Sequence, residues 1–331
     1  MGFIKNLFKK ASGSAPTDWT FVPSVPTPGF TSELITPDEC YVRLKVESAR
    51  LAKDRKFATK FHGVVYSFIT LPRQGETSAE FAAVSKPDKL AALDAQSLNR
   101  VLTISKDMLN AVPWRGGSFG LELGLFSVKS GNLLTPVLDY VARVSSTAGA
   151  SFVGAVKPFL PLITEGMDLV AGQAEDTKTE IAIDTDIALT HSGYYAVIAT
   201  PKNSLDVNKL SCDSTDGKLL LDGVPLDLGY CVFSIRTTKQ KVDFGEIPEL
   251  KEAFGAIRQA IHKNKRTDAD EALAAFRRAA VTSPDLIQQD ATRLIALASD
   301  MVKSAFGATG IASAGGREVG EFGALKLYPA H

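Results

Sequence analysis

Residues 113–129 read Pro-Trp-Arg-Gly-Gly-Ser-Phe-Gly-Leu-Glu-Leu-Gly-Leu-Phe-Ser-Val-Lys. From Phe119 onward, large apolar residues occupy every second position as far as Leu125. Alternation with period two places these side chains on one face of a β-strand. Four large apolar groups on one face need a second layer to cover them. The stretch therefore predicts a central strand in a layered β structure.

Strand patterns continue on both sides of this stretch. Residues 41–48 alternate apolar and charged side chains, which is typical of a strand with one buried face. Further segments of strand composition are 61–71, 81–84, 100–104, 179–190, 194–200 and 229–237. Most connections are too short for helical crossovers, which favours antiparallel order. Two Asp-Gly pairs, Asp216-Gly217 and Asp222-Gly223, predict consecutive tight turns.

Residues 131–173 interrupt the strand pattern. Apolar residues recur at helical spacing from Leu133 to Val141 and again from Phe152 to Leu160. Between positions 144 and 163 the only charged residue is Lys157. We expect a buried helical hairpin that covers the sheet, inserted between the two halves of one β-sandwich. The alternative is a segment that leaves the body and enters lipid, as in pore-forming proteins.

The C-terminal region has the spacing of three helices. Pro248 opens the first, and a cationic run at 262–266 ends it, which suits the negative end of the helix dipole. Residues 267–270 predict a capping box at the start of the second helix. Ser283 and Pro284 predict the N-cap and the first residue of the third. These helices form a unit that either caps the sandwich or docks a partner protein.

The predicted fold is therefore α+β: an antiparallel β-sandwich with an inserted helical hairpin and a C-terminal three-helix unit. The sandwich covers residues 40–245, and the helical unit covers 246–305. Residues 306–331 are rich in Gly and Ala. We expect them to form a loosely ordered tail, with a short edge strand at 324–328.

The N-terminal residues 1–11 read Met-Gly-Phe-Ile-Lys-Asn-Leu-Phe-Lys-Lys-Ala. At about 100° per residue, the apolar residues share one side of a helix and the lysines share the other. So short a helix is marginal alone in water and needs a surface on which to fold. An anionic membrane would accept the apolar side while the lysines meet its headgroups. The residues predicted to bind it are Phe3, Ile4, Lys5, Leu7, Phe8, Lys9 and Lys10.

An alternative of at least equal weight is that this helix docks on its own body or on a sister subunit. Residues 12–39 contain five prolines and predict a semi-rigid linker or a strand-edge arm. Trp19, Phe21 and Phe30 suggest that part of the arm packs on the domain.

A second basic group lies between the first two strand patterns. Its members are Arg50, Lys53, Arg55, Lys56 and Lys60, with only Asp54 to oppose them. We expect a solvated connection. The functional alternative is a second contact with a phosphate-bearing, anionic surface.

One catalytic pattern is present. Residues 116–120 match G-x-S-x-G, but a nucleophile elbow needs a helix after Ser118, and a strand pattern follows instead. The predicted role is a Gly-rich bend that presents Trp114 and Arg115 near the surface. We therefore expect no catalytic residue there and a protein without enzymatic activity.

Metal and cofactor patterns are weak. The four histidines are far apart, and residues 212–223 lack the first and last ligands of an EF-hand. A calcium site shared between β-loops, using Asp184, Asp186 or Asp216, stays open. No phosphate-binding Gly-rich loop occurs, so no cofactor is expected.

The composition bounds the function. Of 331 residues, 45% are hydrophobic and 22% are charged, as in an ordinary globular protein, and the formal net charge of +0 gives no field to attract nucleic acid. Three well-separated cysteines argue against a disulfide framework and for a reducing compartment. We expect a cytoplasmic interaction or scaffold protein, held at the inner face of a membrane by its N-terminal helix. The alternatives are a membrane-perturbing effector and a soluble subunit of a larger assembly, joined through its N-terminal or C-terminal helices.

Overall fold

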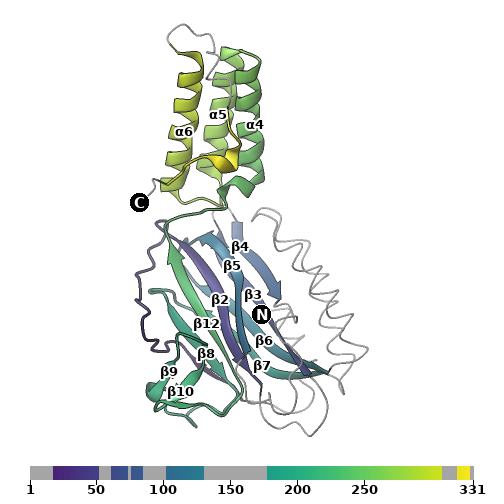
Figure 1. The fold of residues 1–331 in the computed structure, drawn as a ribbon, viewed down its shortest axis with the longest axis vertical. Helices are drawn as coiled ribbons and strands as arrows, with labels where there is room; N and C mark the ends of the chain where they lie inside the picture. Colours follow the sequence, from purple (N-terminus) through teal and green to yellow (C-terminus); the bar gives the residue numbers. More distant parts are fainter. Residues whose placement is uncertain are drawn as a thin grey trace.

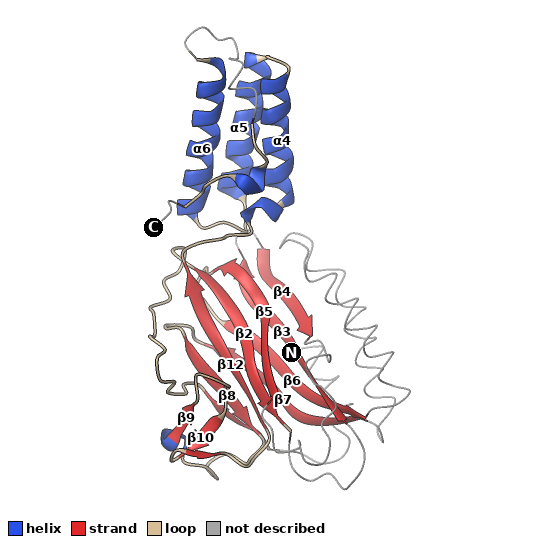
Figure 2. Cartoon of the chain, in the orientation of Figure 1, coloured by secondary structure: helices blue, strands red, loops and turns tan. Residues whose placement is uncertain are grey.

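The computed structural model describes residues 18–51, 61–73, 76–84, 102–129, 177–307 and 319–328. Two antiparallel sheets pack face to face, and three helices stand at one end of them (Figures 1 and 2). The predicted α+β class is confirmed, with its antiparallel sandwich and its C-terminal helical unit. The predicted hairpin at 131–173 lies outside the described residues.

The first sheet has five strands in the order β1-β8-β12-β2-β5, and each neighbouring pair is antiparallel. Its strands are β1 (Thr20–Val22), β2 (Tyr41–Arg50), β5 (Leu102–Pro113), β8 (Gly193–Ile198) and β12 (Tyr230–Thr238).

The second sheet has four strands in the order β4-β3-β6-β7. Its strands are β3 (Phe61–Arg73), β4 (Glu76–Val84), β6 (Phe119–Lys129) and β7 (Thr177–Ile187). The predicted central strand is β6, which pairs with β3 on one side and with β7 on the other. Its apolar set, from Phe119 to Leu125, is at most 1% exposed.

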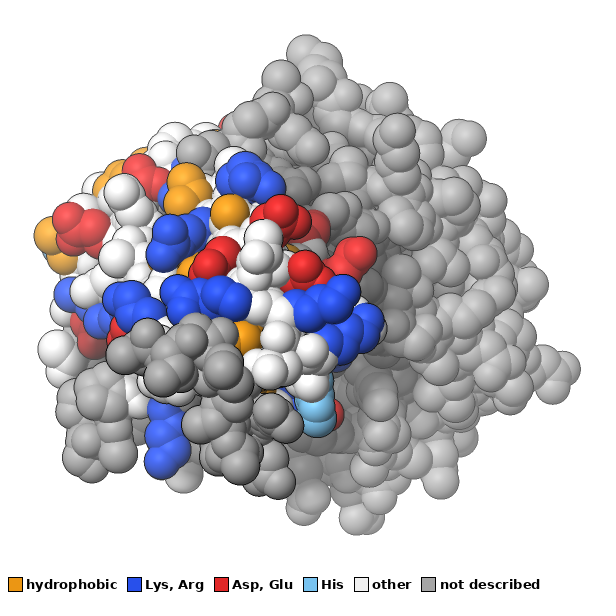
Figure 3. All heavy atoms as spheres, turned by 90° about the horizontal axis from the view of Figure 1, so that it is seen from above, with side chains coloured by type: hydrophobic (Ala, Val, Ile, Leu, Met, Phe, Trp, Pro, Cys, Tyr) orange, Lys and Arg blue, Asp and Glu red, His pale blue; other side chains and the backbone are white. Residues whose placement is uncertain are grey.

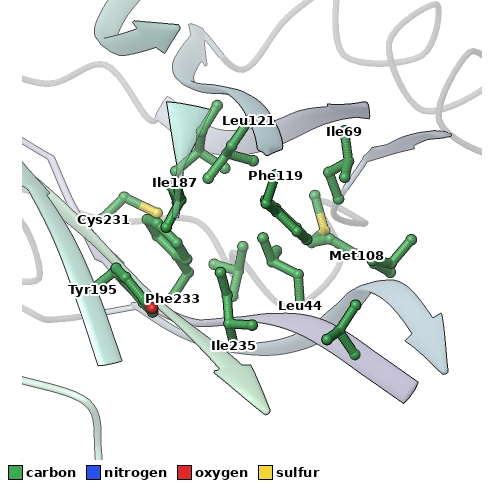
Figure 4. Packing of buried hydrophobic residues seen from close by; sticks show 14 of the residues in the cluster. Leu44, Ile69, Met108, Phe119, Leu121, Ile187, Tyr195, Cys231, Phe233 and Ile235 are labelled. Atoms are coloured by element: carbon green, nitrogen blue, oxygen red, sulfur yellow. The ribbon is translucent and has the colours of Figure 1, made fainter. Parts of the chain in front are cut away.

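The core lies between the two sheets (Figure 4). Phe119 and Leu121 from β6 face Leu44 from β2 and Phe233 from β12, and all four are buried. Each sheet contains strands from before and after residues 131–173. The two β segments of the sequence therefore share one core, as predicted.

A small sheet covers part of the outer face of the five-stranded sheet. Its strands are β9 (Leu210–Cys212), β10 (Leu219–Leu221) and β11 (Val224–Pro225), and the short helix η3 (Val207–Lys209) precedes it. Asp222 and Gly223 both have positive φ, 51° and 79°, as a two-residue type I′ hairpin requires. The other pair, Asp216-Gly217, lies inside a longer connection between β9 and β10.

The helical unit consists of η4 (Phe244–Glu246), α4 (Pro248–His262), α5 (Arg266–Thr282) and α6 (Gln288–Phe306), with η6 (Phe322–Ala324) packed on them. Pro248 occupies the first turn of α4, as predicted. The stripe of buried residues on each helix builds a core separate from that of the sandwich.

The predicted N-caps of two helices are wrong. Helix α5 begins at Arg266 without a side-chain cap, so no capping box forms. Helix α6 begins at Gln288 rather than after Ser283, whose hydroxyl accepts a hydrogen bond of 3.3 Å from the Asp285 N–H. The delay has a packing cause, because Leu286 and Ile287 are buried at the base of the helical unit before α6 starts.

The two ends of the chain pack closely on the body. In the N-terminal arm, β1 pairs with β8, and Phe21 stacks on Tyr195 with ring centroids 6.3 Å apart. The arm is thus a strand-edge arm rather than a free linker over its described residues. At the C-terminus the predicted strand at 324–328 is wrong. Helix η6 ends at Ala324, residues 325–328 form no strand, and Phe322 and Leu327 are buried in the helical core instead.

Candidate functional site at the junction of the sandwich and the helical unit

A buried carboxylate joins the sandwich to the helical unit. Asp290, in the first turn of α6, is 0% exposed. Its Oδ2 atom accepts hydrogen bonds of 2.8 Å from the Tyr41 hydroxyl and 2.6 Å from the Tyr328 hydroxyl. Its Oδ1 atom accepts one of 2.9 Å from Arg293 Nη1. A charge can be buried at tolerable cost only when donors surround it in this way.

The two tyrosines also accept hydrogen bonds. The Tyr41 hydroxyl accepts one of 3.2 Å from the Ile287 N–H, and the Tyr328 hydroxyl accepts one of 2.6 Å from the Lys241 N–H. Burial raises the pKa of both phenols, and the neighbouring Asp290 raises each of them further. Both hydroxyls therefore stay protonated near neutral pH and can keep donating to the carboxylate.

Two cations brace the same junction. Lys241 Nζ donates a hydrogen bond of 2.9 Å to the Ala111 carbonyl, and Arg115 Nη2 donates one of 2.8 Å to the Leu286 carbonyl. The bend after Pro113 thus directs Arg115 to the helical unit. Trp114, predicted near the surface, is only 2% exposed, because the bend folds its ring back into the sandwich core.

The C-terminal residues 319–328, which we call the strap, complete the junction. Phe322 is 4% exposed, and its ring lies 5.2 Å from that of Phe254 and 5.3 Å from that of Phe244. Near its start, the Val319 carbonyl accepts a hydrogen bond of 3.0 Å from Arg258 Nε. Near its end, Tyr328 reaches Asp290. The strap thus spans the helical unit and ends at the sandwich.

The N-terminal arm enters the body at the opposite end. Ile198 pairs with Thr20 in β1 and with Tyr230, the first residue of β12. The last residue of β12, Thr238, pairs with Tyr41 and leads to the helical unit. Figure 1 shows the two ends of β12 at opposite ends of the sandwich. The described part of the arm therefore begins at the end of the sandwich far from the helices.

The residues predicted to bind a membrane, Phe3, Ile4, Lys5, Leu7, Phe8, Lys9 and Lys10, lie outside the described residues, as do Lys53, Arg55, Lys56 and Lys60. Arg50 is described, and it does not belong to a solvated loop. It ends β2, is 5% exposed, and its guanidinium pairs with Asp227 and donates a hydrogen bond of 2.7 Å to the Leu226 carbonyl. Its role in the described fold is to hold the small sheet.

The candidate catalytic and metal residues are not gathered into a site. Ser118 Oγ donates a hydrogen bond of 2.9 Å to Asp186 Oδ1, and β6 follows it rather than a helix. Asp184 and Asp186 lie on β7, whereas Asp216 lies beside the small sheet and pairs with Lys218. Within the described ranges, no group of three His, Cys, Asp or Glu residues is placed to hold a metal ion.

The three cysteines are free and buried. Burial raises the pKa of the Cys231 thiol to about 12, and that of the Cys212 thiol to about 12. Burial also raises the pKa of Cys40. A thiol is nucleophilic only as the thiolate, so these groups are unreactive in the folded protein.

The far end of the helical unit is charged but mixed in sign (Figure 3). Lys263, Lys265 and Arg266 are exposed where α4 ends and α5 begins. Asp268 lies 3.4 Å from Lys265, and Asp270 lies 3.0 Å from Arg266. Exposed pairs of this kind contribute little to stability, and they offset part of the positive charge at this end.

No protein family, curated protein or solved structure matches this chain. In the part of the chain that the structure describes, no helix has the length and apolar character needed to cross a membrane. Sequence reasoning missed the Tyr41–Asp290–Tyr328 cluster. The three residues lie in separate parts of the chain, and none belongs to a recognisable motif. A single Asp in a helical sequence does not indicate that two distant tyrosines will donate hydrogen bonds to it.

Proposed function

We propose that the protein is a non-enzymatic adaptor at the cytoplasmic face of an anionic membrane. In this proposal residues 1–11 hold the protein at the lipid surface, and the helical unit docks a partner protein. The observation that supports the proposal is that the described arm enters the sandwich beside Tyr230, whereas the helical unit follows Thr238 at the other end of β12.

The separation is set by the length of β12. This strand has nine residues, and at about 3.4 Å per residue its ends lie about 27 Å apart. The arm joins at the Tyr230 end, and the helices follow the Thr238 end. An N-terminal segment bound to lipid would therefore leave the helical unit pointing away from the membrane, where a second protein could reach it.

The junction supports a fixed orientation of the helical unit. Tyr41 donates to Asp290 in α6, and Arg115 donates to the Leu286 carbonyl just before α6. After β12, Lys241 donates from its N–H to Tyr328 of the strap and from Nζ to the Ala111 carbonyl of β5. A satisfied buried polar cluster restricts the geometry of the elements that it joins. A docking surface held in this way would keep a constant relation to the membrane.

The described side chains at the arm's entry have mixed charge. Lys202 and Lys209 are exposed there, but so are Asp18, Asp206 and Asp222, and Lys209 Nζ lies 2.9 Å from Asp222 Oδ2. This end therefore offers little net attraction to an anionic surface. Attachment would depend on residues 1–11.

The test is co-sedimentation with vesicles of phosphatidylcholine and phosphatidylserine. We expect the full chain to bind and a chain lacking residues 1–11 to remain in the supernatant. Each lysine near such a surface contributes about 1 kcal/mol, so reversing Lys5, Lys9 and Lys10 to Glu should weaken binding at least roughly 100-fold. Reversing the exposed Lys202 and Lys209 is the matched control and should have little effect.

Equal binding by the full chain and the deletion would contradict the proposal. Release of a trapped dye on binding would instead favour the membrane-perturbing alternative. A change from oligomer to monomer on deletion, measured by light scattering without lipid, would favour the assembly alternative.

A further inference from the structure

We draw no further inference here: the strongest candidate, the surface patch at the small sheet where the side chains of Val207 and Val224 are exposed, carries none, because nothing in the structure shows what covers it.

Discussion

Tyr41 and Asp290 are 249 positions apart in the chain, and a hydrogen bond of 2.8 Å joins their side chains. Tyr41 is the first residue of β2, and Asp290 lies in the first turn of α6. The bond therefore links the sandwich to the last helix of the helical unit. Because Tyr328 donates to the same oxygen, the strap is fixed by the same carboxylate.

Replacing Tyr41 with Phe should destabilise the protein. The change leaves the Ile287 N–H and one lone pair of Asp290 buried without this partner, and such a loss costs about 1–3 kcal/mol. The measurement is the free energy of unfolding in urea. Tyr195→Phe is the control, because Tyr195 is 6% exposed in the same sheet and burial alone raises the pKa of its phenol. The prediction fails if the two variants are equally stable.

Stability should fall at alkaline pH. The folded state raises the pKa of Cys231 from 9.0 to about 12 and raises that of Tyr41 above 10.0. A raised folded pKa gives stability that is complete below the unfolded value and is lost above it, because the unfolded group ionises first. Each such group removes about 1.4 kcal/mol per pH unit above its unfolded pKa.

The expected curve declines from about pH 9, where the unfolded thiols begin to ionise, and steepens above pH 10. The measurement is urea unfolding at intervals from pH 7 to 11. Tyr41→Phe should have a shallower slope above pH 10 than the unaltered chain. Identical slopes would mean that the Tyr41 phenol ionises equally in both states.

Gly245→Ala should displace the strap, since its Cβ would collide with the backbone of Gly323. The loss of stability should approach the roughly 3–5 kcal/mol that removal of a buried Phe side chain costs. Trypsin cleavage after Lys326, which is exposed, should also accelerate. Gly323→Ala is the matched control, and it should change the unfolding free energy by less than about 1 kcal/mol. Equal effects of the two changes would exclude the crossing as the cause.

Arg50→Gln should lower stability and leave membrane binding unchanged. The variant loses charge-assisted hydrogen bonds to Asp227 and to the Leu226 carbonyl, worth about 2–3 kcal/mol. Urea unfolding and vesicle co-sedimentation measure the two properties. A weaker affinity for vesicles without a loss of stability would contradict this prediction and support the alternative that Arg50 contacts an anionic surface.

The features set by local pattern could be predicted from the sequence. Alternation in residues 119–125 identified a central strand, and the Asp222-Gly223 pair identified a type I′ hairpin, because each depends on a few neighbouring residues. Pro248 identified the start of α4 for the same reason.

The features set by distant contacts could not be predicted. Ser283 has the chemistry of an N-cap, yet α6 starts at Gln288 because burial of Leu286 and Ile287 at the junction overrides it. Arg50 lies in a basic stretch of sequence, but its guanidinium forms an ion pair with Asp227, which is 177 positions away. The strap was predicted as a loose tail. Its packing depends on Gly245, which leaves room for the backbone of Gly323 but lies far away in the sequence, before α4, so no neighbouring residue indicates the contact.

The adaptor proposal requires the two ends of the body to contact different surfaces. Lys202 and Lys263 are exposed at these ends. The lengths of β12 and of the 15-residue α4 place them roughly 50 Å apart along the long axis (Figure 1). Because the native thiols are buried, a cysteine introduced at either position takes a donor dye selectively.

The most direct measurement is energy transfer from each dye to acceptor lipids in phosphatidylserine-containing vesicles. The adaptor proposal predicts efficient transfer from position 202 and transfer at least severalfold weaker from position 263. Equal transfer from both positions, or stronger transfer from position 263, would contradict it.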